Sequence, residues 1–189
     1  MTSVPVDDPL TFNVAGLLAQ PSGTVRDIDL HEVAVDPGDG LTVSRPLDGH
    51  VRLTRTNRGL RIEARLTTVL GEECRRCLRP VEVPIEVTLD EEARPSIDLH
   101  SGLPTPLEEG EDLETTRITD HHELELRPLI EQAISLVAPM DVLCEPDCPG
   151  LCAECGQRLS PGHEHPDDDI DPRLEALRAF KVDAPDETG

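Results

Sequence analysis

Apolar and polar residues alternate with a period of two between Leu41 and Leu89. Successive side chains of a β-strand point to opposite faces, so this period predicts strands that bury one face only. Asn57 and Gly59 tolerate positive φ and suit a short hairpin turn within the segment. The segment is therefore predicted to form an antiparallel β-sheet. The apolar positions are Val51, Leu53, Leu60, Ile62, Ala64, Leu66, Val81, Val83, Ile85, Val87 and Leu89.

Residues 1–40 are predicted to contribute N-terminal strands. Two short apolar runs flank a Gln-Pro-Ser-Gly sequence, which is typical of a turn. One strand is expected over the first run and a second strand over the other. The first run contains Phe12, Val14 and Leu17, and the second contains Ile28, Leu30, Val33 and Val35.

The segment 41–143 is predicted to hold the sheet, an acidic loop and a helix. Residues 90–125 contain twelve acidic residues and two arginines, with several prolines and glycines. Such a segment buries too little apolar surface to order itself, so we expect a solvated acidic loop. Apolar residues then recur at spacings of three and four up to Pro139, which predicts an amphipathic helix over 126–138. This helix is expected to cover the open face of the sheet.

The segment 144–181 is predicted to form a metal-binding knuckle rich in cysteine and histidine, followed by a short helix. Asp171 and Pro172 suit the cap and first residue of that helix. Residues 182–189 are expected to be a disordered tail. Together these features predict an α+β fold: an antiparallel β-sheet covered by an amphipathic helix, with a C-terminal Cys-rich metal-binding knuckle.

The N-terminal sequence favours a cytoplasmic protein. It has no positively charged start, and its apolar run of about five residues is too short for a signal peptide or a membrane span. In a reducing compartment, closely spaced thiols hold metal more often than they form disulfides. Metal binding is therefore the favoured explanation of the six cysteines.

The cysteines fall into closely spaced groups. Two residues separate Cys74 from Cys77 and Cys152 from Cys155, a spacing that lets two thiolates bind one cation. Gly156 follows the second pair and frees backbone amides to bond the sulfurs, as in zinc knuckles. The candidate metal ligands are Cys74, Cys77, Cys144, Cys148, Cys152, Cys155, His163 and His165.

These donors suffice for two tetrahedral sites, so one or two structural zinc ions are the expected cofactor. In one grouping, the donors from Cys152 to His165 form one site and the first four thiols form the other. In a second grouping, the two Cys-x2-Cys pairs share one site, and Cys144 and Cys148 are structural or spare thiols. Spacing leaves both groupings open. Redox chemistry, an iron–sulfur centre and inert buried thiols are alternative interpretations.

The charge distribution bears on partners. The formal net charge of −22 repels phosphate backbones unless the cations are segregated, so bulk charge favours a basic protein partner. Eight arginines nevertheless lie between residues 52 and 79, with three glutamates. Four of them are expected to form an arginine stripe, which is a candidate nucleic-acid-binding surface. Alternatively, these arginines merely neutralise the acidic loop or keep the strand edge from aggregating. The arginine stripe consists of Arg52, Arg61 and Arg65 on the solvent face and Arg58 at the turn.

No catalytic motif in the sequence indicates an enzyme. There is no glycine-rich phosphate loop and no nucleophile elbow, and the glycines are scattered among turns. With two Phe, no Tyr and no Trp, the chain also has few rings to stack on bases. We therefore expect a protein that is not an enzyme and has no small-molecule substrate.

Four motifs carry a resemblance to the YceD family. They are Cys74-Arg-Arg-Cys77-Leu before a strand, the helix end Ala138-Pro139-Met140, the string Cys148-Pro-Gly-Leu-Cys152-Ala-Glu-Cys155-Gly, and Asp171-Pro172-Arg173-Leu174. The chain resembles that family in this order from about Phe12 to Phe180. Many members have Cys-x-Cys where this chain has His163 and His165, an exchange that keeps the ligand number and favours zinc over an iron–sulfur centre.

The resemblance implies a function in large-subunit (23S) ribosomal RNA accumulation, through its synthesis, processing or stability. It also implies an α+β fold. A factor in large-subunit assembly would bind a basic large-subunit ribosomal protein, pre-ribosomal RNA, or both. The alternative is a zinc- or redox-responsive regulatory protein, in which an exposed thiol of low pKa reacts faster than the others.

Overall fold

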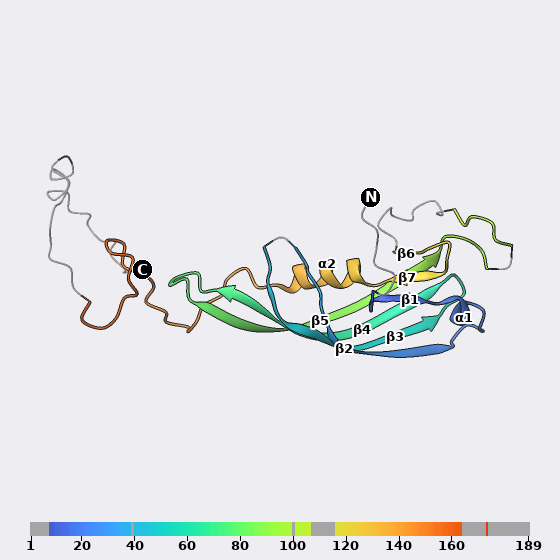
Figure 1. The fold of residues 1–189 in the computed structure, drawn as a ribbon, viewed down its shortest axis with the longest axis horizontal. Helices are drawn as coiled ribbons and strands as arrows, with labels where there is room; N and C mark the ends of the chain where they lie inside the picture. Colours follow the sequence, from blue (N-terminus) through green and yellow to red (C-terminus); the bar gives the residue numbers. More distant parts are fainter. Residues whose placement is uncertain (1–7, 39, 100, 107–115, 164–172, 174–189) are drawn as a thin grey trace, which may run out of the picture. The chain divides into compact units, whose positions relative to one another are not determined.

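The computed structural model describes residues 8–38, 40–99, 101–106, 116–163 and 173. The chain divides into a first unit, Met1–Cys148, and a second unit, Pro149–Gly189. All the helices and strands of the described residues lie in the first unit (Figure 1). The α+β class is confirmed. The elements are β1 (Thr11–Asn13), α1 (Ala15–Leu18), β2 (Val25–Val33), β3 (Val43–Arg55), β4 (Leu60–Glu73), β5 (Pro80–Pro95), β6 (Thr116–Ile118), β7 (Glu123–Glu125) and α2 (Arg127–Val137).

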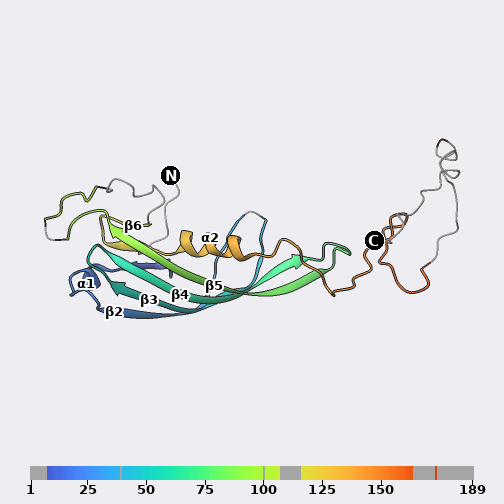
Figure 2. The same cartoon turned by 180° about the vertical axis from the view of Figure 1, so that it is seen from behind.

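The main sheet has the strand order β2-β3-β4-β5-β6 (Figure 2). Strands β2 to β5 run antiparallel to their neighbours, as predicted for the central segment. Strand β6 instead lies parallel to the end of β5, with Ala93 opposite Thr116. The main sheet is therefore mostly antiparallel, as predicted, and the parallel strand β6 that makes it mixed was not predicted. A second sheet pairs β1 with β7.

The period of two in the sequence matches the burial of β3 and β4. Alternate side chains of β4 from Leu60 to Leu70 are buried, while residues of the opposite parity such as Arg61 and Arg65 face solvent. On β5 the same face is buried at Val87 but only partly buried towards Val81. The predicted hairpin between β3 and β4 is present, with the Thr56 N–H donating to the Gly59 carbonyl at 3.0 Å.

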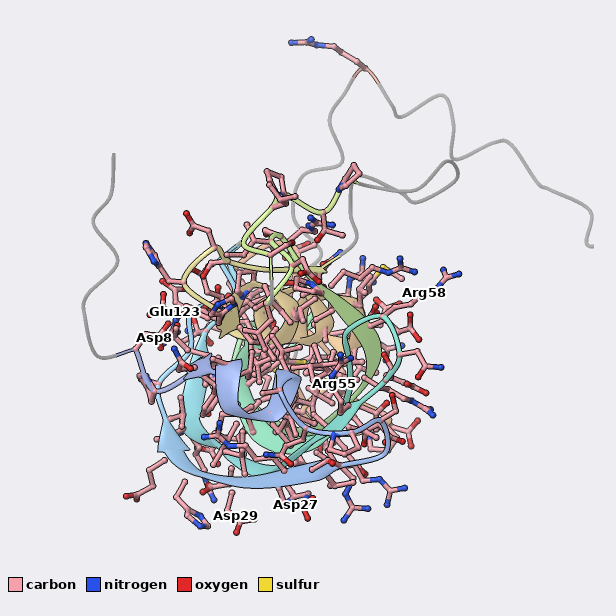
Figure 3. All side chains as sticks on the ribbon, turned by 90° about the vertical axis from the view of Figure 1, so that its right-hand side faces the viewer. Asp8, Asp27, Asp29, Arg55, Arg58 and Glu123 are labelled. Carbon is pink, nitrogen blue, oxygen red and sulfur yellow. The ribbon has the colours of Figure 1, made fainter. Side chains whose placement is uncertain are left out.

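Helix α2 begins at Arg127 and ends at Val137, before Pro139. Its side chains Ile130 and Ile134 are fully buried and belong to the same hydrophobic cluster as the inner face of the sheet. The end-on view shows the sheet curving around this helix (Figure 3). No helix among the described residues is both long and apolar enough to cross a membrane.

The described parts of the acidic segment 90–125 are more ordered than predicted. Residues 90–95 continue β5, and β6 and β7 lie near the end of the segment. Single apolar side chains explain this order, because Ala93, Ile118 and Leu124 are each fully buried in the core. Burial of these anchors outweighs the low average hydrophobicity of the segment. Residues 107–115 lie outside the described part.

The N-terminal prediction is correct for one strand and wrong for part of the other. Strand β2 contains Ile28, Leu30 and Val33, although it ends before Val35. The expected first strand is only the short β1, and the chain then turns into α1 because Leu17 and Leu18 bury their side chains from a helical turn. The residue before α1, Val14, is buried in the core.

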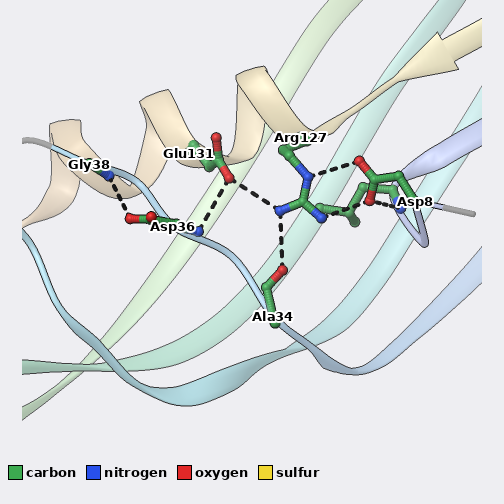
Figure 4. Close-up of polar contacts among 7 residues, drawn as sticks. Asp8, Ala34, Asp36, Gly38, Arg127 and Glu131 are labelled. Carbon is green, nitrogen blue, oxygen red and sulfur yellow. Dashed lines mark hydrogen bonds and ion pairs between the residues drawn. The ribbon is translucent and has the colours of Figure 1, made fainter. Parts of the chain in front are cut away.

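A polar network ties the start of the described chain to α2 (Figure 4). The Arg127 guanidinium donates from Nε and Nη2 to the two carboxylate oxygens of Asp8, at 2.8 and 2.7 Å. Arg127 Nη1 also donates to the Ala34 carbonyl at 3.1 Å and to Glu131 Oε1 at 3.2 Å. The same Glu131 oxygen accepts from the Asp36 N–H at 3.3 Å. Three separate segments are thereby held together.

The Asp8 side chain is only 8% exposed, and its hydrogen bonds with Arg127 hold the pKa of Asp8 below its ordinary value of 3.8. The pairing of ionised Asp8 with Arg127 therefore stabilises the folded state fully above about pH 4. This stabilisation is lost as the pH falls through the lower pKa that Asp8 has in the folded state. Replacing Asp8 with Asn is expected to lower the free energy of unfolding by about 2 kcal/mol at pH 7. Urea unfolding of both proteins at pH 7 and pH 3 checks this. An equal difference at both pH values would contradict the charge-based explanation.

Candidate metal centres

Four thiols meet at one end of the first unit. Cys74 and Cys77 lie in the turn between β4 and β5, and Cys144 and Cys148 lie in the segment that follows α2. The four sulfurs all lie within 4.8 Å of one another, and none of these cysteines forms a disulfide. The Cys74 and Cys148 sulfurs are 3.7 Å apart, and the Cys77 and Cys144 sulfurs are 3.6 Å apart. We call this group the four-thiol cluster.

The geometry of the four-thiol cluster fits a tetrahedral metal ion. Zinc–sulfur bonds of about 2.3 Å place the corners of a tetrahedron about 3.8 Å apart. The two sulfur–sulfur distances above are within 0.2 Å of that edge. Cys74, Cys77 and Cys148 are buried, so an ion held there would be largely shielded from water. The cluster would hold zinc through all four thiolates, with no corner left open.

Backbone hydrogen bonds give the turn at Cys74 the backbone geometry that is typical of zinc knuckles. The Cys74 N–H donates to the Arg79 carbonyl, and the Leu78 N–H donates to the Cys74 carbonyl, both at 2.8 Å. Leu78 has a φ of 57°, a left-handed conformation that glycine adopts more readily. The second Cys-x2-Cys pair repeats this pattern with Gly156, whose φ is 69°. Cys74-Arg-Arg-Cys77 is therefore a knuckle although leucine occupies the usual glycine position.

The surroundings of the four-thiol cluster favour thiolates. Burial alone would raise the pKa of Cys74. Backbone hydrogen bonds from Cys144, Cys77 and Arg76 outweigh burial and lower this pKa to about 6. The backbone N–H of Arg79 likewise lowers the pKa of Cys77. A lowered thiol pKa assists metal binding because zinc binds the deprotonated sulfur.

Three arginines surround the four-thiol cluster, and sequence analysis did not assign them to it. Arg79 Nη2 donates to the Cys144 sulfur at 3.2 Å, and Arg76 Nη1 donates to the Cys148 carbonyl at 3.0 Å. Arg75 forms an ion pair with Asp141. Four thiolates and a divalent cation leave a net charge of −2, which nearby guanidinium groups offset. Their positions in the sequence, within and just after Cys74-Arg-Arg-Cys77, could have indicated that they lie beside the thiols.

A second cluster of side chains that could bind a metal lies in the second unit. It consists of Cys152, Cys155 and His163, whose ligand atoms lie within 4.8 Å of one another. The Cys155 sulfur is 3.5 Å from His163 Nε2, close to the edge expected for mixed sulfur and nitrogen ligands on zinc. Backbone N–H groups of Cys155 and Glu154 lower the pKa of Cys152 to about 7. Its predicted fourth ligand, His165, lies outside the described residues.

The structure gathers the thiols as in the first of the two groupings. The sulfurs of Cys144 and Cys148 lie within 4.8 Å of those of Cys74 and Cys77, so these two cysteines belong to the same group and are not spare thiols. The second cluster contains the other Cys-x2-Cys pair with His163. Seven of the eight candidate ligands thus fall into two sets, each with donors suited to zinc.

The arginine stripe is exposed as expected, but acidic side chains accompany it. Arg52 donates to Asp27 at 2.8 Å, and Arg61 forms a bidentate pair with Asp90 at 2.8 and 2.6 Å. Asp27 projects to solvent from β2, and Arg58 lies at the hairpin turn (Figure 3). Nucleic-acid binding by the stripe stays a prediction. A hollow of about 480 Å³ on this face is lined by His50, Arg52, Glu63, Ala64, Arg65, Thr88, Leu89 and Asp90.

Comparisons with known proteins identify relatives. Residues 62–181, more than half of the chain, match the family described as Large ribosomal RNA subunit accumulation protein YceD. An uncharacterized protein of Mycobacterium tuberculosis is 32% identical over 183 residues, covering 91% of this chain and 81% of its own length. One of Mycobacterium leprae is 31% identical over 175 residues, covering 87% and 74%. No solved structure gives a significant match. The chain belongs to the YceD family.

Proposed function

We propose that this protein is a non-enzymatic factor that supports accumulation of large-subunit (23S) ribosomal RNA. It would act in the cytoplasm on the synthesis, processing or stability of that RNA, during assembly of the large subunit. The observation that carries the proposal is the family match over residues 62–181. The matched segment includes the four-thiol cluster and the second cluster, so both belong to the part that the family defines.

The donor chemistry supports a structural metal. A catalytic zinc keeps one coordination position open for water or substrate, whereas four thiolates fill a tetrahedral shell. The four-thiol cluster also joins the β4–β5 turn to the segment after α2, so a metal bound there would hold these two segments together. We therefore propose structural zinc in this cluster, and a second zinc ion in the cluster of Cys152, Cys155 and His163.

The charge of the chain supports a basic protein as partner. With 39 acidic and 17 basic side chains, the surface attracts cationic segments such as those of ribosomal proteins that contact RNA. Arginines of the stripe pair with Asp27 and Asp90, which reduces the positive charge available to phosphate. A basic large-subunit ribosomal protein is accordingly the first partner proposed, and pre-ribosomal RNA the second.

Depletion of the protein from cells tests the function. The ratio of large-subunit to small-subunit ribosomal RNA is expected to fall, and incomplete large subunits are expected to accumulate on density gradients. Expression of the wild-type chain from a second locus should restore both measurements and serves as the control. An unchanged ratio under complete depletion would reject the proposal.

Thiol chemistry favours one alternative, a zinc- or redox-responsive regulator. The pKa of Cys74 is lowered to about 6, and its sulfur lies 3.7 Å from that of Cys148. A two-electron oxidant can convert two thiolates this close together into a disulfide, which would release a bound metal. Rapid alkylation of Cys74 in the metal-loaded protein would favour this regulator. Slow alkylation that a chelator accelerates would favour structural zinc.

A further inference from the structure

Strand β5 has one edge that is largely unpaired. It pairs with β4 along an unbroken register from Leu60–Ala93 to Glu73–Pro80. On its other side, among the described residues, only Ala93–Pro95 pair with a strand, which is β6. Within the described part of the chain, residues 80–92 therefore present a free edge, and a free edge is a template for an additional strand.

The prolines indicate which part of this edge can accept a strand. Proline lacks an N–H and is tolerated in a strand where the N–H would point to the free edge. Pro80 and Pro84 share the parity of Glu86, Thr88 and Asp90 in the unbroken register. The N–H groups of those three residues accordingly point to the free edge. Positions 80 and 84 lack this donor, so the stretch 86–92 is the part suited to pairing.

The side chains along this stretch specify the chemistry of an added strand. Strand β5 contains five acidic residues and one arginine. Arg45 and Arg61 pair with Glu82 and Asp90, whereas no ion pair is described for Glu86 or Glu92. Both of these glutamates are exposed on the outer face. An added strand would therefore meet negative charge, which basic side chains complement.

The inner face beside the same edge is partly apolar. Leu89 of β5 and Leu129 of α2 are only partly buried and pack against the core. A hollow of about 590 Å³ is lined in part by Leu129 and Pro128, together with polar, acidic and one basic side chain. Alternate side chains of an added strand would therefore contact a surface that is partly apolar. The lining consists of Glu91, Thr116, Arg117, Glu125, Pro128, Leu129 and Gln132.

We propose that the free edge of β5 over residues 86–92 binds an extended basic segment of a partner protein by β-strand addition. Lysine or arginine side chains of the segment would face Glu86 and the outer surface, and the aliphatic side chains between them would face Leu89 and Leu129. Main-chain hydrogen bonds give such a complex its affinity, and the alternating side chains give it specificity. The identity of the partner as a ribosomal protein rests on the proposed function, but the docking surface does not.

A synthetic peptide tests the surface directly. We would titrate the full-length, metal-loaded protein with a peptide of about eight alternating lysine and valine residues. Amide hydrogen exchange is expected to slow at Glu86, Thr88 and Asp90 of β5. A peptide of the same composition, with all lysines before all valines, is the control and is expected to bind much more weakly. Slowed exchange at β2, or equal binding of the control peptide, would overturn the proposal.

Variants separate the main-chain contribution from the charge contribution. Thr88→Pro removes one outward N–H in the parity where Pro80 and Pro84 are already tolerated, and is expected to weaken peptide binding roughly tenfold. The double variant Glu86→Lys and Glu92→Lys changes two outer-face charges, keeps every N–H and is expected to weaken binding by a similar factor. Glu32→Lys, at the exposed opposite edge of the sheet, is the matched control and should bind as wild type. Wild-type affinity in the double variant would overturn the proposal even if Thr88→Pro fails to fold.

The same variants separate this inference from the proposed function. If depletion lowers the large-subunit RNA ratio but the double variant restores it fully, the function stands and the docking proposal fails. If the peptide binds at β5 as expected but depletion leaves the ratio unchanged, the surface stands and the ribosomal role fails.

Discussion

Replacement of Cys148 by serine is expected to remove one zinc equivalent per chain and to destabilise the first unit by at least about 3 kcal/mol. The Cys148 side chain is fully buried, with its sulfur 3.7 Å from that of Cys74. A serine hydroxyl is a poor zinc ligand, and three thiols, two of them buried, would remain without their cation. At roughly 3 °C per kcal/mol for a chain of this size, the melting temperature should fall by about 10 °C. Elemental analysis and thermal unfolding measure the two effects.

The matched control is Cys155→Ser, which changes the exposed thiol of the second cluster. It should also cost one zinc equivalent but should leave the unfolding of the first unit nearly unchanged, because Cys155 belongs to the second unit. A chelator should reproduce the sum of both losses in the wild-type protein. Wild-type protein that contains no metal, or that melts identically with and without chelator, would contradict the assignment of structural zinc.

Gly49→Ala is expected to lower the free energy of unfolding by about 3 kcal/mol. Gly49 lies on β3 opposite Leu66 of β4, and a Cβ at this position would be 2.3 Å from the Arg65 carbonyl oxygen. It would also be 2.8 Å from Leu66 Cα. Both are backbone atoms of a central strand, so they cannot move aside without disturbing the β3–β4 pairing. Chemical denaturation of the metal-loaded protein measures the loss.

Gly71→Ala is the control for that measurement. Gly71 is on β4, the strand that pairs with β3, but the nearest atom to its added Cβ is the Ser44 Cβ at 3.5 Å, an ordinary contact. This variant should be close to neutral, or slightly stabilising because alanine has less backbone entropy to lose. Equal destabilisation by both variants would show that any side chain is harmful in these strands, and would contradict the explanation from close backbone approach.

The central strands could be predicted because burial of one sheet face imposes a period of two on the sequence. The same reasoning failed at β6 and β7, where single buried residues such as Ile118 and Leu124 anchor strands of three residues. A period cannot be detected in so few residues. The parallel pairing of β6 with β5 also depends on how the chain returns after residues 96–115, and no local pattern encodes it.

The candidate metal ligands could be predicted from their chemistry, but their grouping could not. Cys74 and Cys148 are 74 positions apart, and only the path of the chain between them brings their sulfurs together. The knuckle turn at Cys74 could not be predicted from the sequence, because Leu78 occupies the position after the second cysteine where a glycine usually indicates that turn. The pairing of Arg52 with Asp27 likewise depends on the register of β2 against β3, which spacing within one strand does not reveal.

The position of the four-thiol cluster along the chain has a consequence for biosynthesis. Strands β3, β4 and β5 follow one another through short connections, so they can pair as soon as they emerge from the ribosome. Cys74 and Cys77 emerge with them but wait for Cys144 and Cys148. An ion that requires all four sulfurs therefore enters last. Uptake of such an ion would mark the completed first unit, and a nascent chain stopped before Cys144 would have the paired strands but only two of the four sulfurs.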